Sequence, residues 1–186
     1  MIFIILTGAI YPLIITEMAQ FFFPKKANGS FINYGEKNSA SLLIGQNFTN
    51  PKYFYGRPSA TQPFPYNPMD STGSNLSPSN PELINAIKNR EFFLQKINGN
   101  NAEIPIELVE ASGSGLDPHI SPLAAYYQAP RIAKARGLSK EAVQKLILDN
   151  IEGRQFWILG EPRVNVLQLN LALDFAVPKT VGHKND

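Results

Sequence analysis

The chain has 186 residues, with 17 Lys and Arg, 15 Asp and Glu, and no Cys. This length fits one domain once any membrane or targeting segment is set aside. The slight, scattered basic excess gives no electrostatic footprint for nucleic acid, so we exclude nucleic-acid binding. The lack of Cys excludes a disulfide framework, a thiolate zinc site and a cysteine nucleophile.

The N-terminal run from Ile2 to Phe23 is overwhelmingly apolar. A helix over this run is roughly 33 Å long, against about 30 Å for the hydrocarbon core of a bilayer. The sequence FFFPKK that closes the run is typical of an aromatic and cationic anchor at a membrane surface. A signal peptide needs a basic region before the run and a small-x-small cleavage site after it, and the sequence shows neither. We therefore predict a transmembrane anchor over residues 1–24.

Gly8 and Pro12 fall in the middle of this span. Gly permits close approach of another helix, and Pro removes a backbone donor, so both residues are candidate contacts with other transmembrane helices. The charges leave the orientation open. Lys25 and Lys26 after the span would keep the body in the cytoplasm, yet the positive-inside rule weakens when a long domain follows.

After the anchor, a short buried strand is predicted at Ser41–Ile44, closed by Gly45. The next stretch, YFYGRPSATQPFPYNPMDSTGSNLSPSNP, is too rich in Pro for a continuous helix. Such a stretch is either disordered or pinned by the fold, and its aromatic residues argue that it is pinned. Arg57 and Tyr66 of this stretch are candidate contacts with a partner.

Helices are predicted in the second half of the chain from their start and stop signals. The first helix begins at Pro81 and stops at the sequence NGNN. The second begins after Ser121, with Pro122 in its first position, and ends at Gly137. We expect an interruption at Pro130, because a proline inside a helix removes a backbone hydrogen bond.

A third helix is predicted over the sequence SKEAVQKLILDNI, with Ser139 as its N-cap. Ile151 is expected on its buried face. The tail sequence EPRVNVLQLNLALDF alternates like a strand and also repeats like a helix capped by Asn165; we favour the helix. The fold class is therefore a mixed α/β body over residues 25–178, preceded by one transmembrane helix. The sequence does not determine the topology of the body. We expect residues 179–186 to be a disordered tail.

The sequence ELVEASGSGLDPHISP invites comparison with catalytic motifs. A serine hydrolase elbow needs G-x-S-x-G around Ser114, and Ser112 stands where the first Gly must be. No Lys follows the glycines, as a phosphate-binding loop would require. His119 and His183 cannot form a metal site alone, and the carboxylates are too dispersed to complete one. The sequence therefore predicts no catalytic residue and no metal site.

The same stretch is better interpreted as a structured turn. Gly-Ser-Gly usually marks backbone that needs positive φ or close approach, and Asp117-Pro118 and Ser121-Pro122 are consecutive helix-start signals. A polar turn of this kind can also meet a partner. Its candidate contact residues are Ser112, Ser114, Asp117 and His119.

Taken together, the motifs TGAIYPL, KANGS, LIGQNF, YFYGRPSA, YNPMDSTGSNLSPSNPEL, ELVEASGSGLDPHIS, PRIAKARGLS and EPRVNVLQLNLALD span Leu6 to Asp174. In this order they resemble the C subunits of the bacterial Kdp complex, an ATP-driven high-affinity potassium pump. Members of that family usually carry a basic segment before the span, so we expect the natural start to lie further upstream. With that segment the charges would favour a cytoplasmic N-terminus and an extracytoplasmic body in the inner membrane.

The resemblance implies an accessory subunit without catalytic activity of its own. Its partners would be a P-type ATPase subunit, a channel-like potassium-translocating subunit and a small stabilising peptide, within membrane lipid. It implies support of ATP use by the ATPase subunit, with ATP acting through the complex and no cofactor intrinsic to this chain. Two alternatives stay open: an extracytoplasmic domain that covers the mouth of the channel-like subunit without nucleotide, and, more remotely, an anchored hydrolase.

Overall fold

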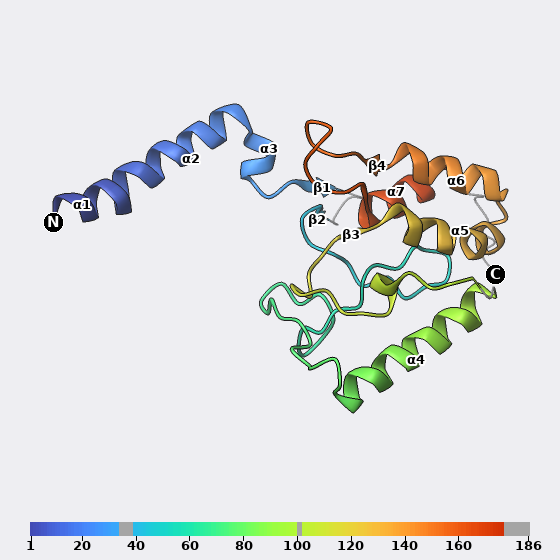
Figure 1. Cartoon of the computed structure of the whole chain (residues 1–186). Helices are drawn as coiled ribbons and strands as arrows, with labels where there is room; N and C mark the ends of the chain where they lie inside the picture. Colours follow the sequence, from blue (N-terminus) through green and yellow to red (C-terminus); the bar gives the residue numbers. More distant parts are fainter. Residues whose placement is uncertain (34–38, 100–101, 177–186) are drawn as a thin grey trace, which may run out of the picture. The chain divides into compact units, whose positions relative to one another are not determined.

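The computed structural model describes residues 1–33, 39–99 and 102–176, so the disordered tail predicted at 179–186 lies outside the described residues. The chain divides into two compact units, Met1–Leu43 and Ile44–Asp186. The first holds an apolar helix and a two-stranded sheet, and the second holds further helices and a three-stranded sheet (Figure 1). This confirms the predicted class, one N-terminal apolar helix followed by a mixed α/β body.

One apolar helix makes up most of the first unit. Its consecutive parts are α1 (Ile2–Ile5), η1 (Leu6–Ile10) and α2 (Tyr11–Phe22). The whole helix has 21 residues, and an 18-residue stretch of it has a mean hydropathy of 1.9 and no residue buried inside the protein. By length and composition it can cross a membrane, and it ends within two residues of the predicted boundary.

A π-helical turn interrupts this helix just before Pro12. The backbone N–H of Tyr11 donates to the carbonyl oxygen of Leu6, five residues back. Because the proline ring and its missing N–H do not fit the regular ladder, the turn before it widens. Gly8 lies inside this turn, and a Cβ added there would meet nothing within 4 Å.

The rest of the first unit comprises α3 (Pro24–Ala27), β1 (Phe31–Asn33) and β2 (Ser39–Ser41), the two strands being antiparallel. The strand predicted at Ser41–Ile44 is wrong, since β2 ends at Ser41 and a turn follows. The Ser41 hydroxyl donates to the Gly29 carbonyl oxygen (2.7 Å) and accepts from the Leu43 N–H (3.1 Å). A hydroxyl that bonds the backbone two residues on favours a turn over a strand.

The second unit contains a small antiparallel sheet with the strand order β3-β5-β4. Its strands are β3 (His119–Ile120), β4 (Ile151–Glu152) and β5 (Arg163–Asn165). His119 pairs with Asn165, and Ile151 pairs with Val164. The central strand β5 leads directly into a helix, so the ambiguous tail sequence is a short strand followed by a longer helix.

The helices of the second unit are α4 (Pro81–Asn98), the 3-10 turn η2 (Ile106–Leu108), α5 (Pro122–Arg136), α6 (Lys140–Asp149) and α7 (Val166–Ala176). Side-chain oxygens of Asn80, Ser121 and Ser139 accept backbone N–H groups at the starts of α4, α5 and α6. Gly99 and Gly137 end α4 and α5 in the left-handed conformation. The predicted start and stop signals are confirmed at these positions.

The interruption predicted at Pro130 is wrong, because α5 continues through it. A proline inside a helix costs about 3 kcal/mol. Burial of the helix around it offsets this cost, since Ala125, Ala129 and Ile132 are fully buried.

Two further predicted helix features differ in the structure. α6 ends at Asp149, where the Asn150 side chain donates to the Leu146 carbonyl oxygen (2.8 Å), so Ile151 lies in β4 and not on a helix face. Asp117-Pro118 precedes a strand rather than a helix. By contrast, Asn165 does cap α7, with its side-chain oxygen accepting from the Gln168 N–H (3.1 Å).

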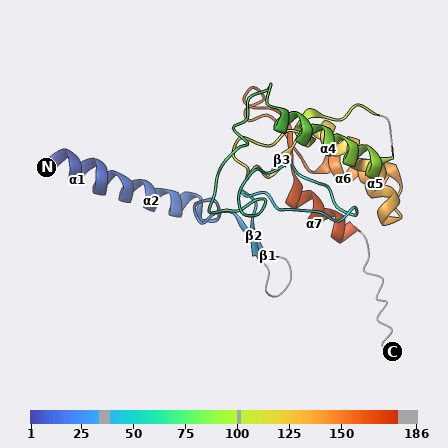
Figure 2. The same ribbon diagram turned by 90° about the horizontal axis from the view of Figure 1, so that it is seen from below.

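The core of the second unit forms where α5, α6 and α7 meet the sheet. The two views show α5 beside α6 (Figure 1, Figure 2). Its fully buried large side chains include Phe54, Ile120, Ile132, Ile147, Val164, Leu169 and Leu173. Phe54 is the member contributed by the Pro-rich stretch, so that stretch is anchored in the core.

Candidate loop cluster and ligand cavity

Residues 53–57, which we call the pinned segment, are held by side-chain amides from two helices. On α7, Asn170 accepts from the Phe54 N–H (2.8 Å) and donates to the Phe54 carbonyl oxygen (3.0 Å). On α5, Gln128 bonds the N–H and the carbonyl oxygen of Tyr55 in the same way (2.8 and 3.1 Å). Both amides are buried, and each replaces the bonds that a neighbouring strand would provide.

Arg131 of α5 covers the pinned segment from the helix side. Its guanidinium carbon lies 4.4 Å from the centre of the Tyr55 ring, and the residue is 5% exposed. Its nitrogens donate to oxygens of uncharged groups, from Pro51, Tyr53, Asn98 and Gln128. Burial lowers the pKa of Arg131 to about 10, so the group stays charged at neutral pH.

Arg136, five residues further along α5, lies over the ring of Tyr53 as Arg131 lies over the ring of Tyr55. Its guanidinium carbon lies 4.6 Å from the centre of the Tyr53 ring, and it pairs with Asp174 (2.7 Å). The Tyr53 hydroxyl donates to the same carboxylate (3.0 Å). The rings of Tyr53 and Tyr55 thus each make a cation–π contact with an arginine of α5.

In the turn ASGSGLDPH, polar side chains accept hydrogen bonds from backbone N–H groups of the same turn. Ser112, Ser114 and Asp117 each accept a backbone N–H two or three residues on, at 2.8, 3.1 and 3.0 Å. Gly115 has φ of 68°, and a Cβ there would lie 2.5 Å from the Thr72 carbonyl oxygen. The predicted structured turn is therefore confirmed, and glycine is required at position 115.

Arg57 joins the pinned segment to this turn. One of its terminal nitrogens donates to the Asp117 carboxylate (3.2 Å), and the Ser112 N–H donates to the Pro58 carbonyl oxygen (3.0 Å). Burial acts to raise the pKa of Asp117, but hydrogen bonds from His119 and the charge of Arg57 outweigh it and hold that pKa below its usual value. Asp117 therefore stays ionised and keeps the link closed.

Tyr66 completes the same cluster. Its hydroxyl donates to the Arg57 carbonyl oxygen (2.5 Å), and burial, reinforced by the Asp117 carboxylate, raises its pKa to about 12. Gly45 provides the room: a Cβ there would lie 2.3 Å from the Tyr66 ring and 2.7 Å from the Asp117 carbonyl oxygen. Tyr66, the pinned segment and the turn therefore form one packed unit, which we call the loop cluster.

The structure thus brings together the contact residues predicted in the body: Arg57, Tyr66, Ser112, Ser114, Asp117 and His119. Gly8 and Pro12 lie in the other unit. Contact of any of these residues with a partner stays a prediction.

A cavity of about 310 Å³ adjoins the loop cluster and faces α4. Its lining includes Tyr55 and Phe93, whose rings stack 6.3 Å apart, together with Arg57 and Arg90. Among the described residues the lining includes no Asp or Glu. Both guanidinium groups already have partners, since Arg57 pairs with Asp117 and Arg90 donates to the Val109 carbonyl oxygen (2.8 Å). The stacked rings are therefore the part of the lining best suited to a planar or apolar ligand group.

The hydroxyl and imidazole considered for catalysis are engaged locally. The Ser114 hydroxyl accepts the Leu116 N–H, and His119 Nδ1 lies 3.6 Å from the Asp117 carboxylate. Within residues 1–33, 39–99 and 102–176, no group of three or more His, Asp or Glu side chains could hold a metal ion. In the described residues these side chains position the loop.

Sequence reasoning missed the side chains that hold the cluster and line the cavity, chiefly Asn170, Gln128, Arg131, Arg90 and Phe93. One signal was available for Asn170. It lies in the apolar run of α7 on the buried face, and a buried amide is almost always hydrogen-bonded. That pattern indicates a distant backbone partner, although it does not identify Phe54.

Comparison with known proteins agrees with the motifs. The family model described as "KdpC: K+-transporting ATPase, c chain" matches residues 1–175. The potassium-transporting ATPase KdpC subunit of Methylococcus capsulatus is 54% identical over 175 residues, which cover 94% of this chain and 92% of that protein. The KdpC subunit of Polynucleobacter asymbioticus is 56% identical, with 91% and 90% covered, and that of Geobacter metallireducens is 52% identical, with 96% and 94% covered. The expected resemblance is confirmed, and the chain belongs to the KdpC family.

Proposed function

We propose that this chain is an accessory, non-catalytic subunit of an ATP-driven potassium uptake pump that stabilises the complex and supports ATP use by a P-type ATPase subunit. The observation that carries the proposal is the family match over residues 1–175, because the relatives are named as subunits of a potassium-transporting ATPase. The further partners we propose are a channel-like potassium-translocating subunit, a small stabilising peptide and membrane lipid.

The exposed apolar helix supports a single-pass anchor in the inner membrane. In water such a surface would be unfavourable, and lipid or other membrane helices are what cover it. Gly8 offers open space for a neighbouring helix, and Pro12 sets the widened turn beside it. We place the N-terminus in the cytoplasm and the body outside it.

The loop cluster supports a role in contact rather than in catalysis. Its serines and Asp117 are committed to local backbone bonds, so they fix the shape of a surface. ATP would act through the complex rather than as a resident cofactor of this chain.

The proposal is tested by potassium-stimulated ATP hydrolysis of the purified complex as a function of ATP concentration. Breaking the Arg57–Asp117 link with Asp117→Asn should raise the KM for ATP or loosen the complex, whereas Lys88→Gln on the solvent side of α4 should change neither. Complexes that assemble, hydrolyse ATP and transport potassium normally without this chain would contradict the proposal.

A second candidate function is to cover the extracytoplasmic mouth of the channel-like subunit without binding nucleotide. It is favoured because backbone N–H groups of the glycine-rich turn are already engaged: those of Gly115 and Leu116 donate to the Ser112 and Ser114 hydroxyls. That leaves fewer N–H groups for a phosphate cradle. Potassium-stimulated ATP hydrolysis by the complex with and without this chain separates the two functions. A changed KM for ATP favours ATP support, whereas an unchanged KM for ATP with altered potassium affinity favours the cover.

A further inference from the structure

The connection between β4 and β5 is a hairpin with an unusual tip. Gln155 and Leu159 pair through two backbone hydrogen bonds of 2.8 and 2.9 Å. Between them Phe156 and Trp157 adopt φ values of 51° and 68°. Large aromatic residues are uncommon in this left-handed region, where hairpin turns favour Asn and Gly. The chain therefore reverses at a point that presents large apolar side chains.

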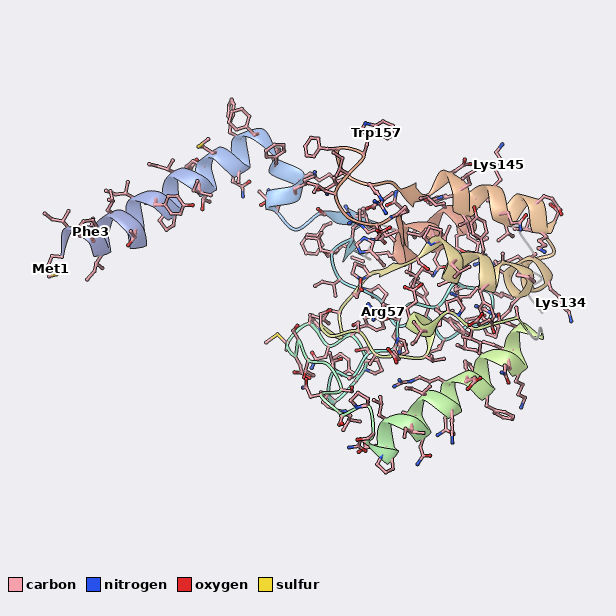
Figure 3. All side chains as sticks on the ribbon, viewed as in Figure 1. Met1, Phe3, Arg57, Lys134, Lys145 and Trp157 are labelled. Carbon is pink, nitrogen blue, oxygen red and sulfur yellow. The ribbon has the colours of Figure 1, made fainter. Side chains whose placement is uncertain are left out.

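These side chains point to solvent rather than to the core. Phe156 is 82% exposed, Trp157 93%, Ile158 76% and Leu159 58%. Figure 3 shows Trp157 at the end of the loop, outside the packed helices and strands of its unit. We call residues 156–159 the hairpin tip.

Paired charges flank the hairpin tip. Arg154 bonds both carboxylate oxygens of Glu161 (2.6 and 2.8 Å), and Arg163 bonds Glu152 (3.0 Å). The pairs cancel one another in charge, so the hairpin carries an apolar end above a neutral, polar base. Aromatic and apolar groups at one end and charged groups beside them are the combination found at a membrane surface.

The size of the hairpin tip argues against a second copy of the chain as its occupant. Aromatic side chains bury about 150–250 Å² each, so the two aromatic side chains of the hairpin tip, Phe156 and Trp157, offer roughly 300–500 Å². A stable protein interface needs about 800 Å² from each partner. A bilayer sets no such minimum, and a chain that is already anchored needs only a weak additional contact to stay at the surface.

We propose that the hairpin tip inserts into the interfacial layer of the bilayer that holds the apolar helix. Phe156, Trp157 and Ile158 would reach the boundary between the lipid headgroups and the acyl chains, with Leu159 nearer the charged base of the hairpin. The contact gives the body a second attachment to the membrane. This inference rests on the membrane anchoring in the proposed function.

Trp157 is the single Trp of the chain, so its fluorescence reports the hairpin tip directly. The full-length chain is reconstituted into phosphatidylcholine and phosphatidylglycerol vesicles, with or without bromine on the lipid acyl chains. We expect brominated lipid to remove most of the Trp157 emission and soluble acrylamide to have little effect. The matched control combines Trp157→Phe with Met69→Trp, because Met69 is 91% exposed in the same unit. Emission from the Trp at position 69 should not be quenched by brominated lipid and should be quenched by acrylamide.

Flotation of the vesicles separates failure of the anchor from failure of the inference. Chain that does not float with lipid contradicts the membrane anchoring itself. Chain that floats while Trp157 is quenched by acrylamide and not by brominated lipid overturns the proposed insertion. Trp157 that is shielded from both quenchers also overturns it, because protein would then cover the hairpin tip.

Discussion

The pinned segment and the hairpin tip are both short and rich in aromatic residues, yet they occupy opposite environments. Phe54 is fully buried and its backbone groups are bonded by Asn170, whereas Trp157 is almost fully exposed. Two helices supply amides and guanidinium groups to the first segment. In the described residues the hairpin tip receives only the bonds of its own turn.

Aromatic content by itself therefore does not decide which segments of this chain are buried. An aromatic segment without regular secondary structure has backbone groups that must be bonded before it can be buried. Asn170 and Gln128 meet that need for the pinned segment, which lets Phe54 enter the core. The hairpin bonds its own backbone and leaves its side chains free for an outside partner.

The largest expected effect is on the pinned segment. Asn170→Leu keeps the side-chain size but leaves the buried N–H and carbonyl oxygen of Phe54 without partners. Each unpaired buried group costs about 1–3 kcal/mol, so for two groups we expect a loss of roughly 2–6 kcal/mol in unfolding free energy. Urea unfolding of the full-length chain in detergent measures it. The exposed Gln168→Leu on the same helix serves as the control, and equal effects of the two would contradict the role of the amide.

Next in size is the packing that holds the pinned segment against Tyr66. Gly45→Ala places a Cβ against the Tyr66 ring and the Asp117 carbonyl oxygen, and such overpacking costs about 1–3 kcal/mol. We expect the same unfolding experiment to show this loss. Gly153→Ala, where a Cβ meets nothing within 4 Å, should cost less. A neutral Gly45→Ala would show that the cluster is loosely packed.

Tyr66 should give the cluster a dependence on alkaline pH. Its pKa is raised from 10.0 to about 12, so the unfolded chain loses the hydroxyl proton first as pH rises. The stability from Tyr66 is therefore complete below pH 10 and lost as pH rises toward 12, by roughly 2–3 kcal/mol. The difference in unfolding free energy between the wild type and Tyr66→Phe should shrink across that range. A constant difference would contradict the buried neutral phenol.

The smallest expected effect on stability lies at the hairpin tip. Trp157→Ser removes a side chain that is 93% exposed, so the unfolding free energy in detergent should change by less than about 0.5 kcal/mol. A loss as large as that from Asn170→Leu would erase the contrast between the two segments.

Local signals predicted much of the fold. Cap residues such as Ser139 and Asn165 placed helix starts correctly because the side chain bonds its own backbone within a few residues. The apolar run of the first helix and the pinning of the aromatic stretch were predicted for similarly direct reasons. The turn at Ser112 and Ser114 follows the same rule.

The rest depends on contacts that are distant in the sequence. The continuity of α5 through Pro130 is decided by burial on the folded helix, and the bond between Asn170 and Phe54 joins positions 116 residues apart. Neither leaves a local pattern. The cavity likewise forms because Arg90 of α4 and Arg57 line the same space, which the spacing of residues in one sequence does not show.

Membership in the KdpC family makes the chain a subunit of a potassium pump. The most direct test is affinity purification of the tagged chain from detergent-solubilised membranes of potassium-starved host cells, with co-purifying chains identified by mass spectrometry. We predict recovery of a P-type ATPase and a multi-span potassium subunit in a fixed ratio. Recovery of the chain alone, under conditions where those subunits are expressed, would contradict the account.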